Sequence, residues 1–379
     1  MVGRVPSDAS SDVHSDGPRD QRAGASAGAS AGASAEVPAD QPAGAPGEAS
    51  AEVPAEAAGG APGLTVVMYH YVRDLARSRF PSIKGRTVEE FRGQLAWLSR
   101  RHRFVRVEEL LAAWSSSNAP GARPLPERCA LLTFDDGYSD HYRYVFPILE
   151  ELGIQGCFFP PVRALRDRAV LDVNKIHFAL AAAGPEAVAG FCRQRLQDLR
   201  EEHGLEPLGH YLETYARPSR LDPAETVFVK RVLQRGLPEA ARARICGEAF
   251  RRFVTADEAA FAEELYLSPE QVRTMRRAGM HFGAHGVTHR WLDSLDREEQ
   301  AAELRGSRDL LDELGFPPAE RTVAYPYGGL DEVTIEETRA AGFSLGFTTE
   351  PRIARPGRDD PLRIPRLDTV DLPCETAEG

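Results

Sequence analysis

An alternation of short apolar segments with amphipathic helices, running from residue 64 towards the C-terminus, is the strongest restriction on the fold of this chain. Repeated strand–helix units are typical of a parallel sheet covered by helices. The strand count of about seven favours a closed barrel, so the predicted class is α/β, a distorted (β/α)7-type barrel. Strands are expected over residues 64–69, 130–134, 154–159, 280–285, 322–326 and 343–348.

Two segments depart from this alternation. Residues 1–63 contain no Leu, Ile, Phe, Trp or Tyr and repeat the heptapeptide ASAEVPA at 33–39 and 49–55. Such a segment cannot bury enough apolar surface to offset the entropy of ordering it, so a disordered low-complexity tail is predicted. Residues of about 163–266 contain several amphipathic helical stretches and no convincing strand, which predicts a helical insertion within one domain spanning 64–379. Its helices are expected near 186–203, 223–235, 238–253 and 256–265.

Composition excludes several classes of protein. The net charge is −11, and no basic patch is interleaved with aromatic residues, so nucleic acid is not an expected partner. The five cysteines are scattered without a close pair, which indicates reduced thiols. No apolar run reaches about 18 residues and no signal-peptide pattern begins the chain, so neither a transmembrane segment nor export is predicted. A cytoplasmic location is therefore expected, and the oligomeric state is left open.

Polar side chains follow four of the predicted strands. His70 follows the first strand, Asp135 and Asp136 follow the second, His285 ends the fourth and Tyr327 follows the fifth. The carboxyl ends of the strands of a parallel barrel converge on one face, where active sites lie. Packing alone does not readily explain polar residues at four separate strand ends, so we expect these side chains to share a cavity.

Two short motifs among these residues have the chemistry of a metal site. The pair His285-x-x-x-His289 offers two neutral imidazoles, which suit zinc and similar divalent ions. Of the adjacent carboxylates Asp135 and Asp136, one can bind a metal while the other accepts a proton. Asp-Asp-Gly is also an ordinary turn, and the two histidines could equally be a helix cap and a surface residue. The convergence of both motifs favours the metal interpretation.

These motifs resemble those of the polysaccharide deacetylases, the NodB homology domain of carbohydrate esterase family 4. The resemblance covers residues of about 64–162 and 267–370. The T-F-D-D-G motif of the family stands at Thr133–Gly137, and its H-S/T-x-x-H motif stands at His285–His289 with Gly286 in the second place. The resemblance implies Asp135 as general base, and as metal ligands it implies Asp136, His285 and His289.

The remaining motifs depart from the family pattern. The third motif, R-x-P-Y/F, reads Ala324-Tyr-Pro-Tyr327, so the arginine that would tether the base is absent. The resemblance still implies that the Tyr327 backbone N–H stabilises an oxyanion. The catalytic histidine that usually lies near the C-terminus is also missing, because the last histidine is His289. Some relatives are circularly permuted and carry it on the first strand, which implies His70 as general acid.

The predicted function is therefore a metal-dependent hydrolase that removes N-acetyl groups from an amino sugar or an N-acetylated saccharide. Zinc is the first expectation for the metal, with cobalt, nickel or iron as alternatives, and no organic cofactor is expected. Two other interpretations stay open. One is an amide hydrolase on the same scaffold that acts on a non-sugar small amide. The other is a non-catalytic carbohydrate-binding relative, which the missing arginine suggests.

Overall fold

The computed structural model describes residues 63–115, 125–167, 169–219 and 222–374. The predicted tail lies outside these residues, except for Gly63, which begins the first strand.

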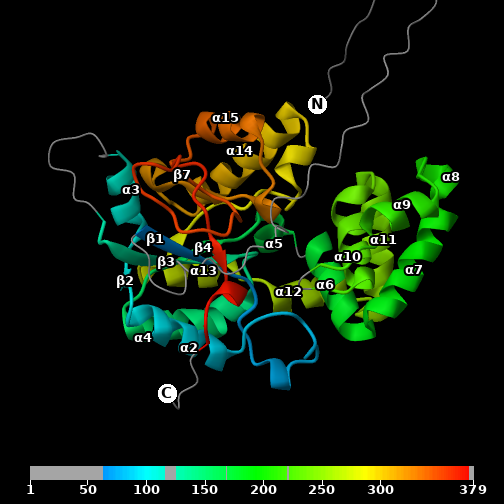
Figure 1. The fold of residues 1–379 in the computed structure, drawn as a ribbon, viewed down its shortest axis with the longest axis horizontal. Helices are drawn as coiled ribbons and strands as arrows, with labels where there is room; N and C mark the ends of the chain where they lie inside the picture. The colour runs from blue at the N-terminus through cyan, green and yellow to red at the C-terminus, as the bar shows by residue number, and fades with distance from the viewer. Residues whose placement is uncertain (1–62, 116–124, 168, 220–221, 375–379) are drawn as a thin grey trace, which may run out of the picture. The chain divides into compact units, whose positions relative to one another are not determined.

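The centre of the fold is a parallel sheet with the strand order β5-β4-β3-β1-β8 (Figure 1). All registers are parallel, and Tyr69 at the end of β1 lies opposite Phe134 of β3. A further strand, β2, pairs with β3 near its beginning. The bounds are β1 (Gly63–Tyr69), β2 (Arg103–Phe104), β3 (Arg128–Asp135), β4 (Gly156–Phe159), β5 (His281–Phe282) and β8 (Leu367–Asp368).

Two more parallel strands, β6 (Thr322–Ala324) and β7 (Leu345–Phe347), complete the ring. A single bridge from Ala284 to Val323 joins β6 to the segment after β5, and one from Phe347 to Ile364 joins β7 to the segment before β8. The described strands therefore close into a distorted α/β barrel, as predicted. The closing segment around Ile364 was not among the predicted strands.

Helices cover the outside of this barrel. Thr87 and Glu90 form a capping box at the start of α2, and Ser268 and Gln271 form another at α13. The bounds are α2 (Val88–Ser99), α3 (Val107–Ser115), α4 (Phe146–Leu152), α13 (Pro269–Arg277), α14 (Arg297–Glu313) and α15 (Glu332–Ala340). A π-helical turn, His141–Val145, precedes α4, and 3-10 turns lie at Leu75–Arg77, Leu292–Ser294, Pro318–Glu320, Pro326–Gly328 and Thr369–Asp371.

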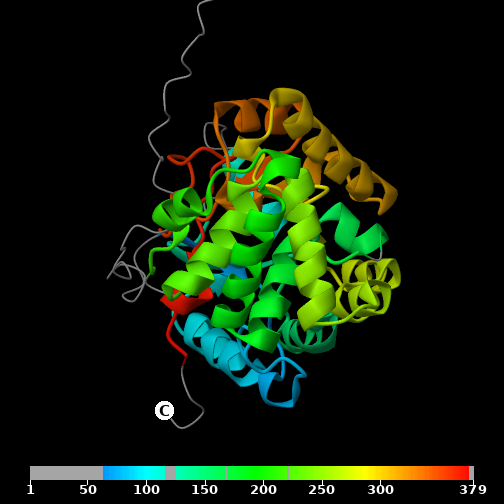
Figure 2. The ribbon, with the colours of Figure 1, turned by 90° about the vertical axis from the view of Figure 1, so that its right-hand side faces the viewer.

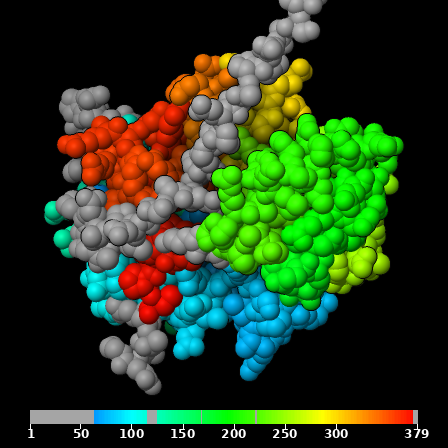
Figure 3. All heavy atoms as spheres, turned by 45° about the vertical axis from the view of Figure 1, so that its right-hand side comes forward, coloured from blue at the N-terminus to red at the C-terminus, as the bar shows by residue number. Residues whose placement is uncertain are grey.

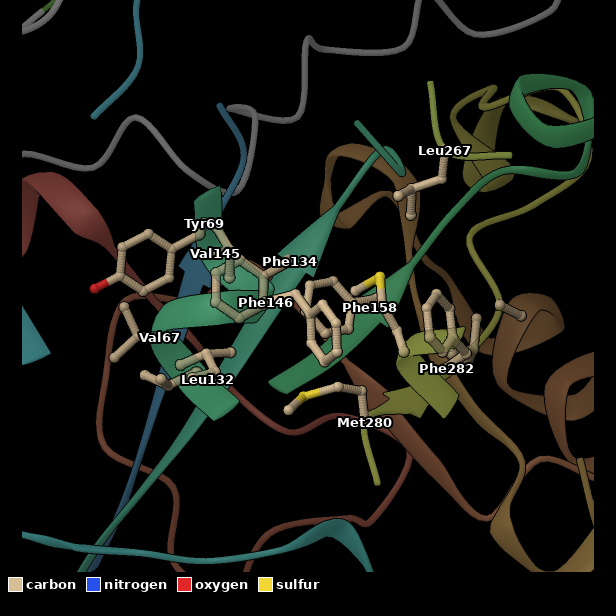
Figure 4. Packing of buried hydrophobic residues seen from close by; sticks show 14 of the residues in the cluster. Val67, Tyr69, Leu132, Phe134, Val145, Phe146, Phe158, Leu267, Met280 and Phe282 are labelled. Atoms are coloured by element: carbon tan, nitrogen blue, oxygen red, sulfur yellow. The ribbon is translucent and has the colours of Figure 1, made fainter. Parts of the chain in front are cut away.

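Aromatic side chains form much of the core between the sheet and these helices. Phe134 of β3 stacks on Tyr69 and on Phe158, with ring centroids 5.2 and 4.8 Å apart (Figure 4). Both Tyr69 and Phe134 are fully buried. Close-packed stacking of this kind fixes the relative position of β1, β3 and β4, from which the site residues project.

The predicted insertion is helical throughout its described part and has a hydrophobic cluster of its own, which includes Cys192, Phe228 and Ile245. Helices α6 to α11 gather as one body (green in Figures 2 and 3). The predictions omitted α5, α6 and α9. The bounds are α5 (Val162–Arg166), α6 (Asp172–Ala183), α7 (Pro185–Asp198), α8 (Arg200–His203), α9 (Leu208–Tyr215), α10 (Ala224–Arg231) with a π turn at Val232–Gly236, α11 (Glu239–Phe253) and α12 (Glu258–Leu265).

Within the described part of the chain, each helix is too short or too polar to cross a lipid bilayer.

Candidate active site

The barrel brings the predicted metal ligands together. Asp136 follows β3, and His285 and His289 lie in the loop after β5. The Nε2 atom of His289 lies 3.1 Å from Oδ1 of Asp136, and Nε2 of His285 lies 3.5 Å from the same oxygen. One ligand atom from each residue falls within 4.8 Å of the others, and all three residues are buried.

The hydrogen bonds around these residues leave the ligand atoms available. His285 donates from Nδ1 to the carbonyl oxygen of Ala324 at 2.7 Å, so its Nε2 carries the lone pair that faces Asp136. Tyr138 donates from its hydroxyl to Oδ2 of Asp136. The other oxygen, Oδ1, is buried without a hydrogen-bond partner among the described residues. Two imidazole nitrogens and one carboxylate oxygen that converge in this way fit a divalent metal such as zinc.

Backbone strain marks the same site. Within the described residues, non-glycine positions with positive φ occur at Asp136 (70°), His289 (61°) and Tyr327 (57°). Each such position costs about 1–2 kcal/mol and persists only where the surrounding structure enforces it. All three are residues that the sequence singled out, so the strain supports a functional site here independently of side-chain chemistry.

A buried glutamate shapes the loop between the two histidines. Glu303 of α14 accepts hydrogen bonds from the backbone N–H groups of Val287 (2.6 Å) and Thr288 (2.9 Å) and from the Thr288 hydroxyl (2.6 Å). Gly286 has φ 72°, and a Cβ atom there would lie 3.0 Å from the Glu303 carboxylate. The glycine that departs from the family motif is therefore matched to the glutamate that holds this loop.

Asp135 is tethered by an arginine that the sequence analysis did not identify. Arg366 donates to Oδ1 of Asp135 at 2.9 Å, and its second terminal nitrogen lies 2.8 Å from Oδ2. The guanidinium also donates to Thr133 Oγ1 and to the Thr348 carbonyl oxygen. The arginine of the third motif is absent, but Asp135 still has an arginine partner. The motif position is indeed Ala324, but an arginine from the segment that closes the barrel supplies the contact.

Charges around the two aspartates favour their ionised forms. Burial raises the pKa of Asp135, but the Arg366 guanidinium and nearby His285 outweigh burial and hold that pKa below its usual value. Burial likewise acts to raise the pKa of Asp136, and His289 and His285 hold it well below its ordinary range. Both carboxyls are therefore anionic at neutral pH, as a base and a metal ligand require.

His70 lies at the end of β1 and is half-buried. It is near enough to Asp135 and Asp136 for its charge to influence the pKa of both. Its carbonyl oxygen is 2.8 Å from Nε2 of His141, which is fully buried and has a pKa lowered to about 4 by burial. The neutral His141 thus donates this hydrogen bond and anchors the backbone at His70. The circular permutation that the position of His70 suggested stays a prediction.

Tyr327 completes the group of predicted residues. Its ring stacks on Trp291, with centroids 4.8 Å apart, and packs edge-on against His289 at 4.6 Å. A pocket beside His289 and Tyr327 has its opposite wall in the insertion. The polar insertion residues in that wall are Asp172, Gln234 and Arg242, and Asp172 pairs with Arg242 at 3.4 Å.

Three residues of the site were not predicted: Arg366, Tyr138 and Glu303. Tyr138 lies two residues after Asp136, a spacing that could have drawn attention to it. Arg366 and Glu303 gave no local signal, because charged residues are usually exposed and their partners lie far away in the sequence.

The fold and the site together define a parallel α/β barrel with an Asp–His–His cluster, able to hold a metal ion, at the carboxyl ends of its strands. The family model described as polysaccharide deacetylase matches residues 122–174 and 248–346, which contain both motifs. These two segments therefore match the polysaccharide deacetylase family. The match is interrupted within the helical insertion.

Similar proteins carry related names. The chain is 19% identical over 292 residues to YxkH of Bacillus subtilis (strain 168), which is named as a polysaccharide deacetylase, across 77% of this chain and 66% of that protein. It is 37% identical over 90 residues to the poly-beta-1,6-N-acetyl-D-glucosamine N-deacetylase of Escherichia coli (strain K12), across 23% of this chain and 12% of that protein. The chain thus spans less than two thirds of the length of these relatives.

Solved structures with a similar arrangement include IcaB from Ammonifex degensii, at 22% identity and a TM-score of 0.48, covering 81% of this chain and 91% of that chain. The deacetylase PplD of Streptococcus pyogenes shows 17% identity and a TM-score of 0.47, covering 81% and 92%.

Proposed function

We propose that this protein is a metal-dependent N-deacetylase that hydrolyses the acetamide of an N-acetylated amino sugar to acetate and a free amine. The observation that carries the proposal is the buried Asp136–His285–His289 set, with the ionised Asp135 directly beside it. A carboxylate free to accept a proton next to a metal ligand set is the arrangement that hydrolysis of an unactivated amide requires.

Asp136, His285 and His289 would hold the metal. A divalent ion there would supply Lewis acidity towards the acetamide carbonyl and the attacking water. Asp135 accepts a proton from that water, and Arg366 keeps this carboxylate both ionised and aimed. The buried Arg366–Asp135 ion pair thus takes the place of the contact that the motif arginine would have made.

Two further groups complete the proposed reaction. The Tyr327 N–H donates a hydrogen bond to the carbonyl oxygen as negative charge develops, and the strained φ of 57° fixes its direction. His70 donates a proton to the amine nitrogen as the carbon–nitrogen bond breaks. Its place beside both aspartates is suited to this role.

For the substrate we propose an N-acetylhexosamine unit. The cavity that Asp172, Gln234 and Arg242 line beside His289 measures about 20 Å³, enough for a water molecule but not for a sugar ring, so the support for a saccharide comes from the family match. The relative from Escherichia coli is named for a polymer of N-acetylglucosamine.

A second candidate is hydrolysis of a non-sugar small amide by the same residues. A non-catalytic carbohydrate-binding protein was suggested by the missing motif arginine. Arg366 contacts Asp135 instead, so that argument no longer applies. A cytoplasmic location stays a prediction.

The test is acetate release by the zinc- or cobalt-reconstituted protein from N-acetylglucosamine oligomers and from small N-acetylated amines. The proposal expects turnover of the saccharides, and its loss in an Asp135→Asn variant that still binds metal. Turnover of small amides alone would favour the second candidate. Full activity of Asp135→Asn would contradict the assignment of the base.

A further inference from the structure

A buried hydroxyl lies behind the carboxylate of Asp136. Tyr138 is fully buried and donates its hydroxyl proton to Oδ2 of Asp136, on the side away from the two histidines. An ionised carboxylate can only accept hydrogen bonds. The Tyr138 oxygen must therefore satisfy its lone pairs with another donor.

That donor comes from the helical insertion. Asn174 of α6 is fully buried, and its Nδ2 atom lies 2.7 Å from the Tyr138 hydroxyl and 2.9 Å from the Tyr71 hydroxyl. Its Oδ1 atom accepts from the Tyr266 hydroxyl at 2.6 Å, and the Tyr266 oxygen accepts from the Leu171 N–H at 2.9 Å. Both hydrogens of Nδ2 and the amide oxygen of Asn174 are thus engaged.

The direction of each hydrogen bond follows from its neighbours. Tyr138 has one proton, and Asp136 takes it. If the Asn174 amide were reversed, its oxygen would face Tyr138 and compete with Asp136 for that single proton. The orientation with Nδ2 towards Tyr138 is therefore the one that is consistent with the ionised Asp136.

The tyrosine ring is also held in place. Tyr138 stacks on Tyr71 with ring centroids 4.0 Å apart, and the Tyr266 ring lies nearly parallel to Tyr138 with centroids 6.4 Å apart. The hydroxyl can move little relative to Asp136, so the hydrogen bond fixes which carboxylate oxygen turns towards His285 and His289.

We propose that Asn174 of the helical insertion is a positioning residue for the metal ligand Asp136, and that it acts through the Tyr138 hydroxyl. The inference rests on the proposed function in that it needs a metal at this site. It gives the insertion a second task besides lining the pocket, because its helix α6 then orients one of the three ligands. Partners of metal ligands in such positions typically contribute a 10–100-fold effect on metal affinity.

The test measures the zinc dissociation constant of the full chain by competition with a chromophoric chelator, and the visible absorption of the cobalt-loaded forms. We expect Asn174→Leu and Tyr138→Phe each to weaken zinc binding by about 10–100-fold and to alter the cobalt spectrum. If Asn174 acts through Tyr138, the double variant binds zinc no more weakly than Tyr138→Phe alone. Asn174→Asp keeps the acceptor for Tyr266 but removes the donor, and it should also weaken binding if Asn174→Leu does not fold.

The matched control is Ile176→Ala, a core truncation in the same helix. Ile176 is 2% exposed and packs in the insertion's own cluster, so its truncation should lower the melting temperature and leave the zinc affinity unchanged. Unchanged affinity in Asn174→Leu, equal weakening in Ile176→Ala, or fully additive losses in the double variant would each overturn the proposal. Failure of the unaltered protein to bind zinc would instead contradict the metal site itself.

Discussion

Replacement of Arg366 by methionine removes one partner of the buried ion pair that holds Asp135. The side chains of Arg366 and Asp135 are 0% and 2% exposed, and two contacts of 2.9 and 2.8 Å join them. Removal of one partner of a buried pair leaves an uncompensated charge and costs about 3–5 kcal/mol. This is a large share of the free energy of unfolding of a typical domain, about 5–15 kcal/mol.

The same change acts on the proposed base. Without the guanidinium, burial of Asp135 is no longer outweighed to the same extent, so its pKa rises. The base form is then lost at a higher pH, and the acid limb of the pH profile of kcat/KM moves upward. Arg366→Lys keeps the charge but not the two-pronged contact, so we expect a smaller change of the same sign.

The assay combines urea unfolding with the pH dependence of acetate release. Arg363→Met is the matched control, because Arg363 lies three residues earlier and pairs with Glu332 at 2.7 Å, with side chains 36% and 82% exposed. Such an exposed pair contributes about 0–1 kcal/mol. The double variant Asp135→Asn/Arg366→Met should recover part of the lost stability, since it leaves no unpaired charge. An acid limb and a stability in Arg366→Met equal to those of the control would refute the reasoning.

Two further predictions concern stability and the loop after β5. His141 and His281 are buried, with pKa values lowered to about 4 by burial, so between about pH 6.5 and 4 the unfolded chain binds protons that the native chain does not. The free energy of unfolding should therefore decrease as the pH is lowered through this window, by up to about 1.4 kcal/mol per pH unit for each histidine. His281→Gln should reduce this slope, measured by urea titration at several pH values. An unchanged slope in that variant would contradict the assignment. Gly286→Ala forces a side chain into φ 72° against Glu303, and it should cost about 1–2 kcal/mol and weaken zinc binding; stability and affinity equal to those of the unaltered chain would show that the loop does not need the glycine.

Local chemistry made much of the fold predictable. The apolar run of β3 needed only its immediate neighbours in the sequence, and the predicted strand was confirmed. The metal ligands could be found because barrel topology requires strand ends to converge. The structure brings Asp136, His285 and His289 to one point, as that reasoning expects.

The residues that were missed depend on contacts between distant segments. The segment Ile364–Asp368 contains Pro365 and Arg366, so it does not look like a strand, yet it closes the barrel. The start of α6 has no side-chain cap at Leu171 that would have marked it. The role of Asn174 depends on its hydrogen bonds to Tyr138, 36 residues earlier, and to Tyr71, 103 residues earlier. Such pairings have no periodicity that a single sequence can reveal.

The central claim is that Asp136, His285 and His289 grip one divalent ion. The most direct measurement is the metal content per chain, by mass spectrometry of the zinc-reconstituted protein after removal of free metal. We expect one equivalent in the unaltered chain and almost none in Asp136→Asn or His285→Ala, each still folded by circular dichroism. A full equivalent of zinc retained by either variant would contradict the account.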